Sequence, residues 1–201
     1  KAIAINSRSF EAHYNLGIIL NALGDFKEAF ISTKKAIKYR PNFAEAYSDL
    51  GLILIDLGKI KEAEIYFHKA IKLNPHYPNS YFNLAAVMKI LGRIKEAEEN
   101  TIKAIEIKPK CEIFHYNLGL IRKELGKIEQ AELSFLKAIE INSNFVKAYY
   151  SLSLLNISKF NNKQLKYIFS SHILNCKENS NNLELISDIY FTRGNILEKE
   201  H

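Results

Sequence analysis

A 34-residue period is the feature that most constrains the fold of this 201-residue chain. Shifting the sequence by that period superimposes one set of leucines and two sets of alanines. The leucines are Leu16, Leu50, Leu84, Leu118 and Leu152, and the alanines are Ala29, Ala63, Ala97 and Ala131, then Ala36, Ala70, Ala104 and Ala138. Repeats of this length pack on their neighbours and share one continuous core, so the period predicts a solenoid.

Each repeat consists of two apolar runs at helical spacing with a glycine between them, which predicts an all-α fold of antiparallel helix–turn–helix repeats. We expect this glycine to end the first helix in the left-handed conformation at Gly24, Gly58, Gly92 and Gly126. Glycines inside the first helix predict close helix contact at Gly17, Gly51 and Gly119. Prolines close successive repeats at Pro41, Pro75 and Pro109. Asn42 and Glu45 have the spacing of a capping box for the helix that follows.

The repeats divide the chain into four segments. Residues 1–9 match the end of a preceding, truncated repeat, and residues 10–145 contain four regular repeats. The regular repeats are Phe10–Phe43, Ala44–Tyr77, Pro78–Cys111 and Glu112–Phe145. Residues 146–179 form a degenerate fifth repeat, because Leu165 and His172 replace the small alanines at a close helix contact. Residues 180–201 are predicted to be a loop and the first helix of a further, truncated repeat, so the sequence looks like a segment of a longer polypeptide.

These residues resemble the tetratricopeptide repeat family, whose unit has an aromatic, Leu-Gly, two alanines around a second aromatic, and a closing proline. In the second repeat the matching residues are Tyr47, Leu50, Gly51, Ala63, Phe67, Ala70 and Pro75. The resemblance implies a right-handed α-solenoid. It also implies that the first helices line a concave groove for extended peptides, while the second helices form the convex back.

The same resemblance places three positions of each first helix in the groove. The first position holds Tyr14, Ser48, Phe82, Tyr116 and Tyr150, the second holds Asn15, Asp49, Asn83 and Asn117, and the third holds Ile18, Leu52 and Leu120. Amides both donate and accept hydrogen bonds, so the asparagines could hold a peptide backbone; the alternative is that each bonds locally. Asp49 interrupts the asparagine ladder and favours a basic or hydrogen-bond-donating group on the ligand.

Other chemistry has little support in the sequence. The net charge of +6 raises nucleic acid as a partner, but the recurring lysines fall on the second helix, where a solvated face is expected, so we consider nucleic acid unlikely. Cys111 and Cys176 lack the spacing of a metal site, and no catalytic motif is present, so we expect no metal, no cofactor and no enzymatic activity. No apolar run is long enough to span a membrane, and a cytoplasmic location is expected.

Two functional hypotheses follow. The first is a protein–protein interaction scaffold that binds an extended peptide or partner segment in the concave groove. The alternative is a non-catalytic arm that recruits or positions the substrate of a larger enzyme, such as a sulfotransferase or a glycosyltransferase. Self-association through the truncated terminal repeats is a further possibility for the partners.

Overall fold

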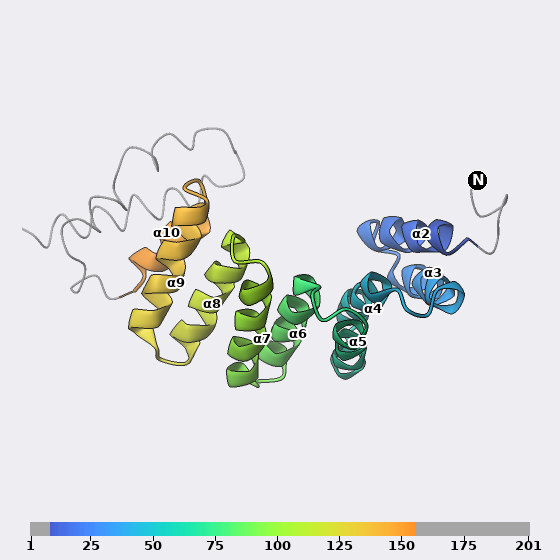
Figure 1. The fold of residues 1–201 in the computed structure, drawn as a ribbon, viewed down its shortest axis with the longest axis horizontal. Helices are drawn as coiled ribbons and strands as arrows, with labels where there is room; N and C mark the ends of the chain where they lie inside the picture. The colour runs from blue at the N-terminus through green and yellow to red at the C-terminus, as the bar shows by residue number, and fades with distance from the viewer. Residues whose placement is uncertain (1–8, 156–201) are drawn as a thin grey trace, which may run out of the picture. The chain divides into compact units, whose positions relative to one another are not determined.

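A computed structural model describes residues 9–155, which form helices and contain no β-strand within that range (Figure 1). The helices come in pairs: α2 (Phe10–Ala22) with α3 (Phe26–Tyr39), α4 (Ala44–Asp56) with α5 (Ile60–Leu73), α6 (Pro78–Ile90) with α7 (Ile94–Ile107), and α8 (Glu112–Glu124) with α9 (Ile128–Ile141). Helix α10 (Val146–Ser153) packs against α9. The predicted all-α fold of packed helix pairs is confirmed. The truncated terminal repeats, and most of the degenerate fifth repeat, lie outside the described residues.

The chain divides into two compact units, Lys1–Pro109 and Lys110–His201, which we call the N-terminal unit and the C-terminal unit. Within the N-terminal unit, the second helix of each pair also packs against the first helix of the next, α3 on α4 and α5 on α6. Within the C-terminal unit, α9 contacts both α8 and α10. Each second helix named here therefore joins its own repeat to the following one.

The turn inside each repeat depends on a glycine with positive φ, as the sequence predicts. At Gly58 φ is +74°, a conformation that side chains disfavour, and the same position is left-handed in the other three repeats. The Gly58 N–H donates to Ile55 O at 2.9 Å, and the Lys59 N–H donates to Leu54 O at 2.7 Å. This pair of bonds is a Schellman motif, which satisfies carbonyls that would otherwise lack a donor at the end of α4.

The start of α4 differs from the prediction. Phe43, not Asn42, is the residue that precedes the helix, and no side chain caps it, so the predicted capping box of Asn42 and Glu45 is wrong. The physical reason is the burial of aromatic surface: the Phe43 ring packs edge-on against Phe10 and Tyr14, with centroids 5.5 and 4.8 Å apart. That packing brings Phe43 to the helix end and leaves Asn42 in the exposed turn.

The two helices of a repeat approach closely because small residues lie between them. Ala63 and Ala70 are fully buried on α5, and Gly51 on α4 faces the buried ring of Phe67. A Cβ atom at Gly51 would lie 2.7 Å from Phe67 Cε1, which is too close for a carbon–carbon contact. In the third repeat the same two positions hold Ala85 and Thr101, both buried. A smaller partner on the second helix thus accompanies the larger residue on the first.

We expect Gly51→Ala to lower the free energy of unfolding by about 1–3 kcal/mol, because the added methyl overpacks the contact with Phe67. Chemical denaturation measures the loss. Combining Gly51→Ala with Phe67→Thr recreates the pair found in the third repeat, so the double variant should be more stable than the two single losses predict. Strict additivity of the two losses would contradict the proposed contact.

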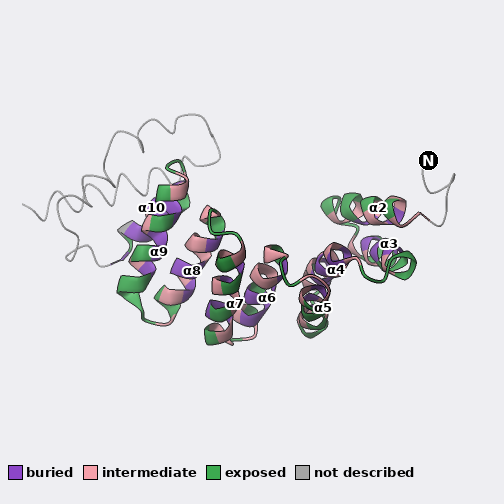
Figure 2. Ribbon diagram, in the orientation of Figure 1, coloured by how far each residue is buried: buried purple, intermediate pink, exposed green. Residues whose placement is uncertain are grey.

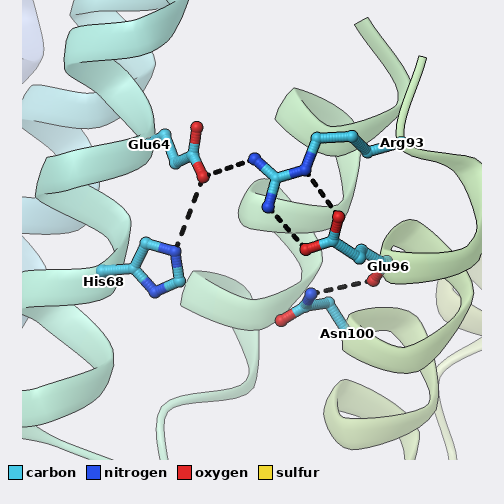
Figure 3. Close-up of polar contacts among 5 residues, drawn as sticks. All are labelled: Glu64, His68, Arg93, Glu96 and Asn100. Atoms are coloured by element: carbon cyan, nitrogen blue, oxygen red, sulfur yellow. Dashed lines mark hydrogen bonds and ion pairs between the residues drawn. The ribbon is translucent and has the colours of Figure 1, made fainter. Parts of the chain in front are cut away.

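An ionic network joins the second and third repeats within the N-terminal unit (Figure 3). Arg93, just before α7, donates from Nη1 to Glu64 Oε1 on α5 at 2.7 Å and from Nε to Glu96 Oε1 on α7 at 2.6 Å. His68 lies beside Glu64, and the Asn100 amide donates to the backbone oxygen of Glu96. The hydrogen bond from Arg93 lowers the pKa of Glu96. The hydrogen bonds to Glu96 and Glu64 raise the pKa of Arg93. The Arg93 side chain is 40% exposed, so water screens these pairs.

Arg93→Ala should destabilise the protein at neutral pH and have less effect in acid. A carboxylate whose pKa is lowered on folding contributes stability above its unfolded value, near 4.3 for glutamate, and loses it as the pH falls further. Urea unfolding of wild type and variant at neutral and acidic pH tests this. Lys59→Ala is the matched control, because Lys59 has the same repeat position and, among residues 9–155, forms an ion pair only with Glu62 of its own repeat, at 3.1 Å. An Arg93→Ala effect that does not depend on pH would contradict the ionic mechanism.

Candidate functional site

Two of the predicted groove positions meet between successive repeats. Tyr14 Oη on α2 donates to Asp49 Oδ2 on α4 at 2.7 Å. In the next interval, the Asn83 amide donates to Ser48 Oγ at 3.5 Å. Each bond joins the first groove position of one repeat to the second groove position of the next, and we call this arrangement the inter-repeat bond. These predicted site residues therefore also hold neighbouring first helices in register.

The C-terminal unit contains the same inter-repeat bond, between Ser151 Oγ and Tyr116 Oη at 3.4 Å. The Tyr116 ring packs edge-on against Phe145, with centroids 5.3 Å apart. Leu120 and Tyr150 are half-buried and pack on the core of this unit. Three predicted site residues thus contribute to the packing of this unit: Tyr116, Leu120 and Tyr150.

The three predicted asparagines differ in their surroundings. Asn117 donates its amide to Ile113 O one turn earlier on α8, at 2.8 Å, which is the local alternative. Asn83 donates to Ser48, which is only 1% exposed. The Asn15 side chain is exposed and forms no hydrogen bond within the described part of the chain. The three amides of the predicted ladder are therefore not equivalent. Phe82, the predicted site residue beside Asn83, is half-buried.

A hollow of about 190 Å³ lies among α2, α3 and α4 in the N-terminal unit. Three predicted site residues line it: Ile18, Asp49 and Leu52. The remaining lining residues are Gly17, Asn21, Thr33 and Ile53. Sequence reasoning missed Asn21, although a single amide within the apolar run GIILNAL was an available signal.

Two residues that line the hollow, Asn21 and Asp49, have side-chain oxygens that accept hydrogen bonds. Asn21 Oδ1 is buried and has no hydrogen-bond partner. Burial raises the pKa of Asp49, the bond from Tyr14 opposes that shift, and the charge of Glu45 one turn earlier adds to it. The pKa of Tyr14 is raised by burial and by its bond to Asp49, so its hydroxyl stays protonated and donates. The arrangement therefore suits a ligand group that donates hydrogen bonds.

The described residues contain no group of three or more His, Cys, Asp or Glu side chains that could hold a metal ion. None of the helices between residues 9 and 155 is both long enough and apolar enough to cross a bilayer.

Comparison with known proteins matches the repeats to one family. Models of the tetratricopeptide repeat match residues 44–77, residues 66–99, and residues 10–43 together with 114–145. No curated protein matches the chain.

Solved structures with a similar fold include MamA from Desulfovibrio magneticus RS-1, with 21% identity, a TM-score of 0.69, and coverage of 82% of this chain and 93% of that one. TTC0263, a thermophilic TPR protein of Thermus thermophilus, has 21% identity, a TM-score of 0.68, and coverage of 92% and 98%. YrrB, described as a TPR protein with an unusual peptide-binding site, has 18% identity, a TM-score of 0.64, and coverage of 92% and 94%. At these identities the likeness shows the fold alone.

Asp49→Asn should leave the protein at least as stable as wild type at neutral pH. A carboxyl group whose pKa is raised on folding opposes folding once it is ionised, and this cost disappears below its unfolded pKa, near 3.9. Asparagine keeps an acceptor for Tyr14 and carries no charge. Denaturant unfolding at neutral and acidic pH measures the difference, with Asp56→Asn as the control because Asp56 is an exposed aspartate at the last residue of α4. Marked destabilisation at neutral pH would show that the Asp49 charge is structural.

Proposed function

Because the chain belongs to the tetratricopeptide repeat family, we propose that it is a protein-interaction scaffold that holds an extended partner segment along its first helices. A hydrogen-bond-donating side chain of that segment occupies the hollow among α2, α3 and α4. The single observation that carries this proposal is the buried, unpartnered Asn21 Oδ1 in a hollow that also contains Asp49. The peptide-binding site named for YrrB is a property of that protein and supports the proposal only as an example within the fold.

The energetics of the hollow favour a donor as its occupant. A buried oxygen without a hydrogen-bond partner costs about 1–3 kcal/mol, and a donor from the ligand removes that cost. Burial also disfavours the Asp49 carboxylate, so a cationic group placed beside it gains more than it would beside a solvated aspartate. Asn21 Oδ1 and the Asp49 carboxylate thus line the same hollow, and both gain from a hydrogen-bond donor placed there.

The walls of the hollow favour the stem of a long side chain. Ile18 is 45% exposed, and Leu52 is half-buried, so both present apolar surface beside the two acceptors. Lysine and arginine carry an apolar stem and a donating head, which matches this combination. The volume of about 190 Å³ lies below the roughly 300–1,000 Å³ of pockets that enclose drug-sized molecules, so one side chain is the fitting occupant.

The alternative hypothesis, a non-catalytic arm of a larger enzyme, uses the same groove to recruit a substrate. No feature of residues 9–155 favours it over a scaffold. Nucleic acid is a poorer ligand for the predicted groove residues, because base stacking needs accessible aromatic rings. The Tyr14 ring packs against Phe43, and the Tyr116 ring packs against Phe145.

Selection from a displayed random-peptide library tests the proposal. Wild-type protein should enrich peptides that share a lysine or arginine at one fixed position. Asp49→Lys places a positive charge in the hollow, so the same peptides should bind it at least about tenfold more weakly. Asp56→Lys is the matched control, because it makes the same change of charge at an exposed site on the same helix.

Two results would overturn this function. The first is failure of the wild-type protein to enrich any peptide family. The second is enrichment of peptides whose affinity is unaffected by Asp49→Lys, which would place binding away from the hollow. Circular dichroism of both variants checks that the helices are retained.

A further inference from the structure

The second helices of the first two repeats expose an isoleucine to solvent at the same repeat position. Ile31 on α3 is 54% exposed, and Ile65 on α5 is 66% exposed. Both helices bury their small residues at other positions, and Figure 2 shows that each helix contains buried as well as exposed residues. Ile31 lies two residues from Thr33, which lines the hollow, and two residues span more than half a turn of a helix. The exposed isoleucines therefore lie on a surface separate from the hollow.

Exposed lysines flank both isoleucines, one helical turn before and one turn after. They are Lys27, Lys34 and Lys35 around Ile31, and Lys61 and Lys69 around Ile65, with Lys38 and Lys72 one turn further along. None of these lysines forms an ion pair with any residue between 9 and 155. We call the two isoleucines and these seven lysines the basic face.

In the third and fourth repeats, the lysine equivalent to Lys35 and Lys69 forms an ion pair with a glutamate three residues later. Lys103 on α7 pairs with Glu106 at 2.7 Å, and Lys137 on α9 pairs with Glu140 at 2.8 Å. Their counterparts in the first two repeats, Lys35 and Lys69, instead have Lys38 and Lys72 at that spacing. Like charges three or four residues apart destabilise a helix by about as much as opposite charges stabilise it, roughly 0.2–0.5 kcal/mol. At this repeat position, the first two repeats therefore keep an electrostatic cost that the later two avoid.

We propose that the basic face is a second binding surface, and that its partner is an acidic amphipathic segment of another protein. Apolar side chains of the segment cover Ile31 and Ile65, and its carboxylates pair with the surrounding lysines. Charge complementarity is the argument for this occupant, because a dense set of lysines that form no ion pair with residues 9–155 attracts a carboxylate-rich chain and steers its approach. Because Thr33 and Ile31 lie on different sides of α3, the hollow and the basic face can be occupied together.

The apolar residues of the basic face argue against two other anionic partners. Isoleucine cannot stack on nucleobases, and base stacking on aromatic rings is what holds single-stranded nucleic acid. A membrane surface needs a continuous apolar stripe, whereas each isoleucine here is bracketed by charged residues along its own helix. The acidic side chains Glu28 and Glu62 lie one turn before the isoleucines and would be repelled by anionic lipid, but a protein segment can place a donor opposite each one.

A designed probe tests the proposal on the full chain. The probe is a labelled helical peptide with leucines on one face and a glutamate one turn to either side of each leucine. Fluorescence anisotropy should show binding that weakens with added salt. Replacing every glutamate of the probe by glutamine should weaken it by about tenfold or more, because the exposed ion pairs are lost.

The matched variants use one repeat position and one change of charge. Lys35→Glu with Lys69→Glu should weaken probe binding about tenfold or more, since each reversal replaces an attraction by a repulsion. Lys103→Glu with Lys137→Glu changes the same repeat position in the later repeats by the same charge and should leave binding within about twofold. Ile65→Ser should weaken binding without loss of helical structure, because Ile65 is exposed.

Several results would overturn the proposal. They are equal binding by the two double variants, equal binding of the glutamate and glutamine peptides, or no binding by the wild type. Vesicles containing phosphatidylserine and a labelled single-stranded DNA are run in parallel. Binding of either one that the Lys35→Glu/Lys69→Glu variant loses, with no binding of the peptide, would assign the basic face to lipid or nucleic acid instead.

Discussion

The close contact between the two helices of each repeat is the constraint on which the rest of this structure depends. Fully buried alanines and a glycine allow α4 and α5 to approach until Gly51 touches the Phe67 ring. With the pair fixed, α5 can pack on its own partner and on the next first helix at once. That double packing sets the spacing between successive first helices, and the spacing in turn allows Tyr14 to reach Asp49.

The sequence predicts the features that recur with the period, and it misses those that depend on neighbouring repeats. Gly58 adopts the expected left-handed conformation because that requirement is local to one turn. The inter-repeat bond could not be predicted, because the period does not state which side chain of one repeat faces which side chain of the next. The capping box failed for a similar reason: the Phe43 ring contacts Phe10 of the same repeat, and this tertiary contact outweighs a local cap.

The repeats have similar backbone structure but differ in the charges of their second helices. Helix α3 contains four lysines and one glutamate, whereas α9 contains one lysine and three glutamates, although both follow the same repeat pattern. The acceptors of the hollow, Asn21 and Asp49, lie on α2 and α4, and the basic face lies on α3 and α5, so both belong to the first two repeats. The buried alanines of the second helices thus recur in the described repeats, while the two surfaces proposed to bind partners both lie in the first two repeats.

The inter-repeat bond limits how freely this array can be rebuilt from its own parts. Tandem repeats are often regarded as interchangeable modules that duplication or deletion can rearrange. Here a copy of the second repeat, inserted directly after the original, would place its aspartate opposite Ser48 rather than Tyr14. At that repeat position Asn83 reaches Ser48 only at 3.5 Å, whereas Tyr14 donates to Asp49 at 2.7 Å, so the copied aspartate would have a longer and weaker bond. Each repeat is consequently matched to the one before it, and the order of the repeats is part of the structural information that the chain carries.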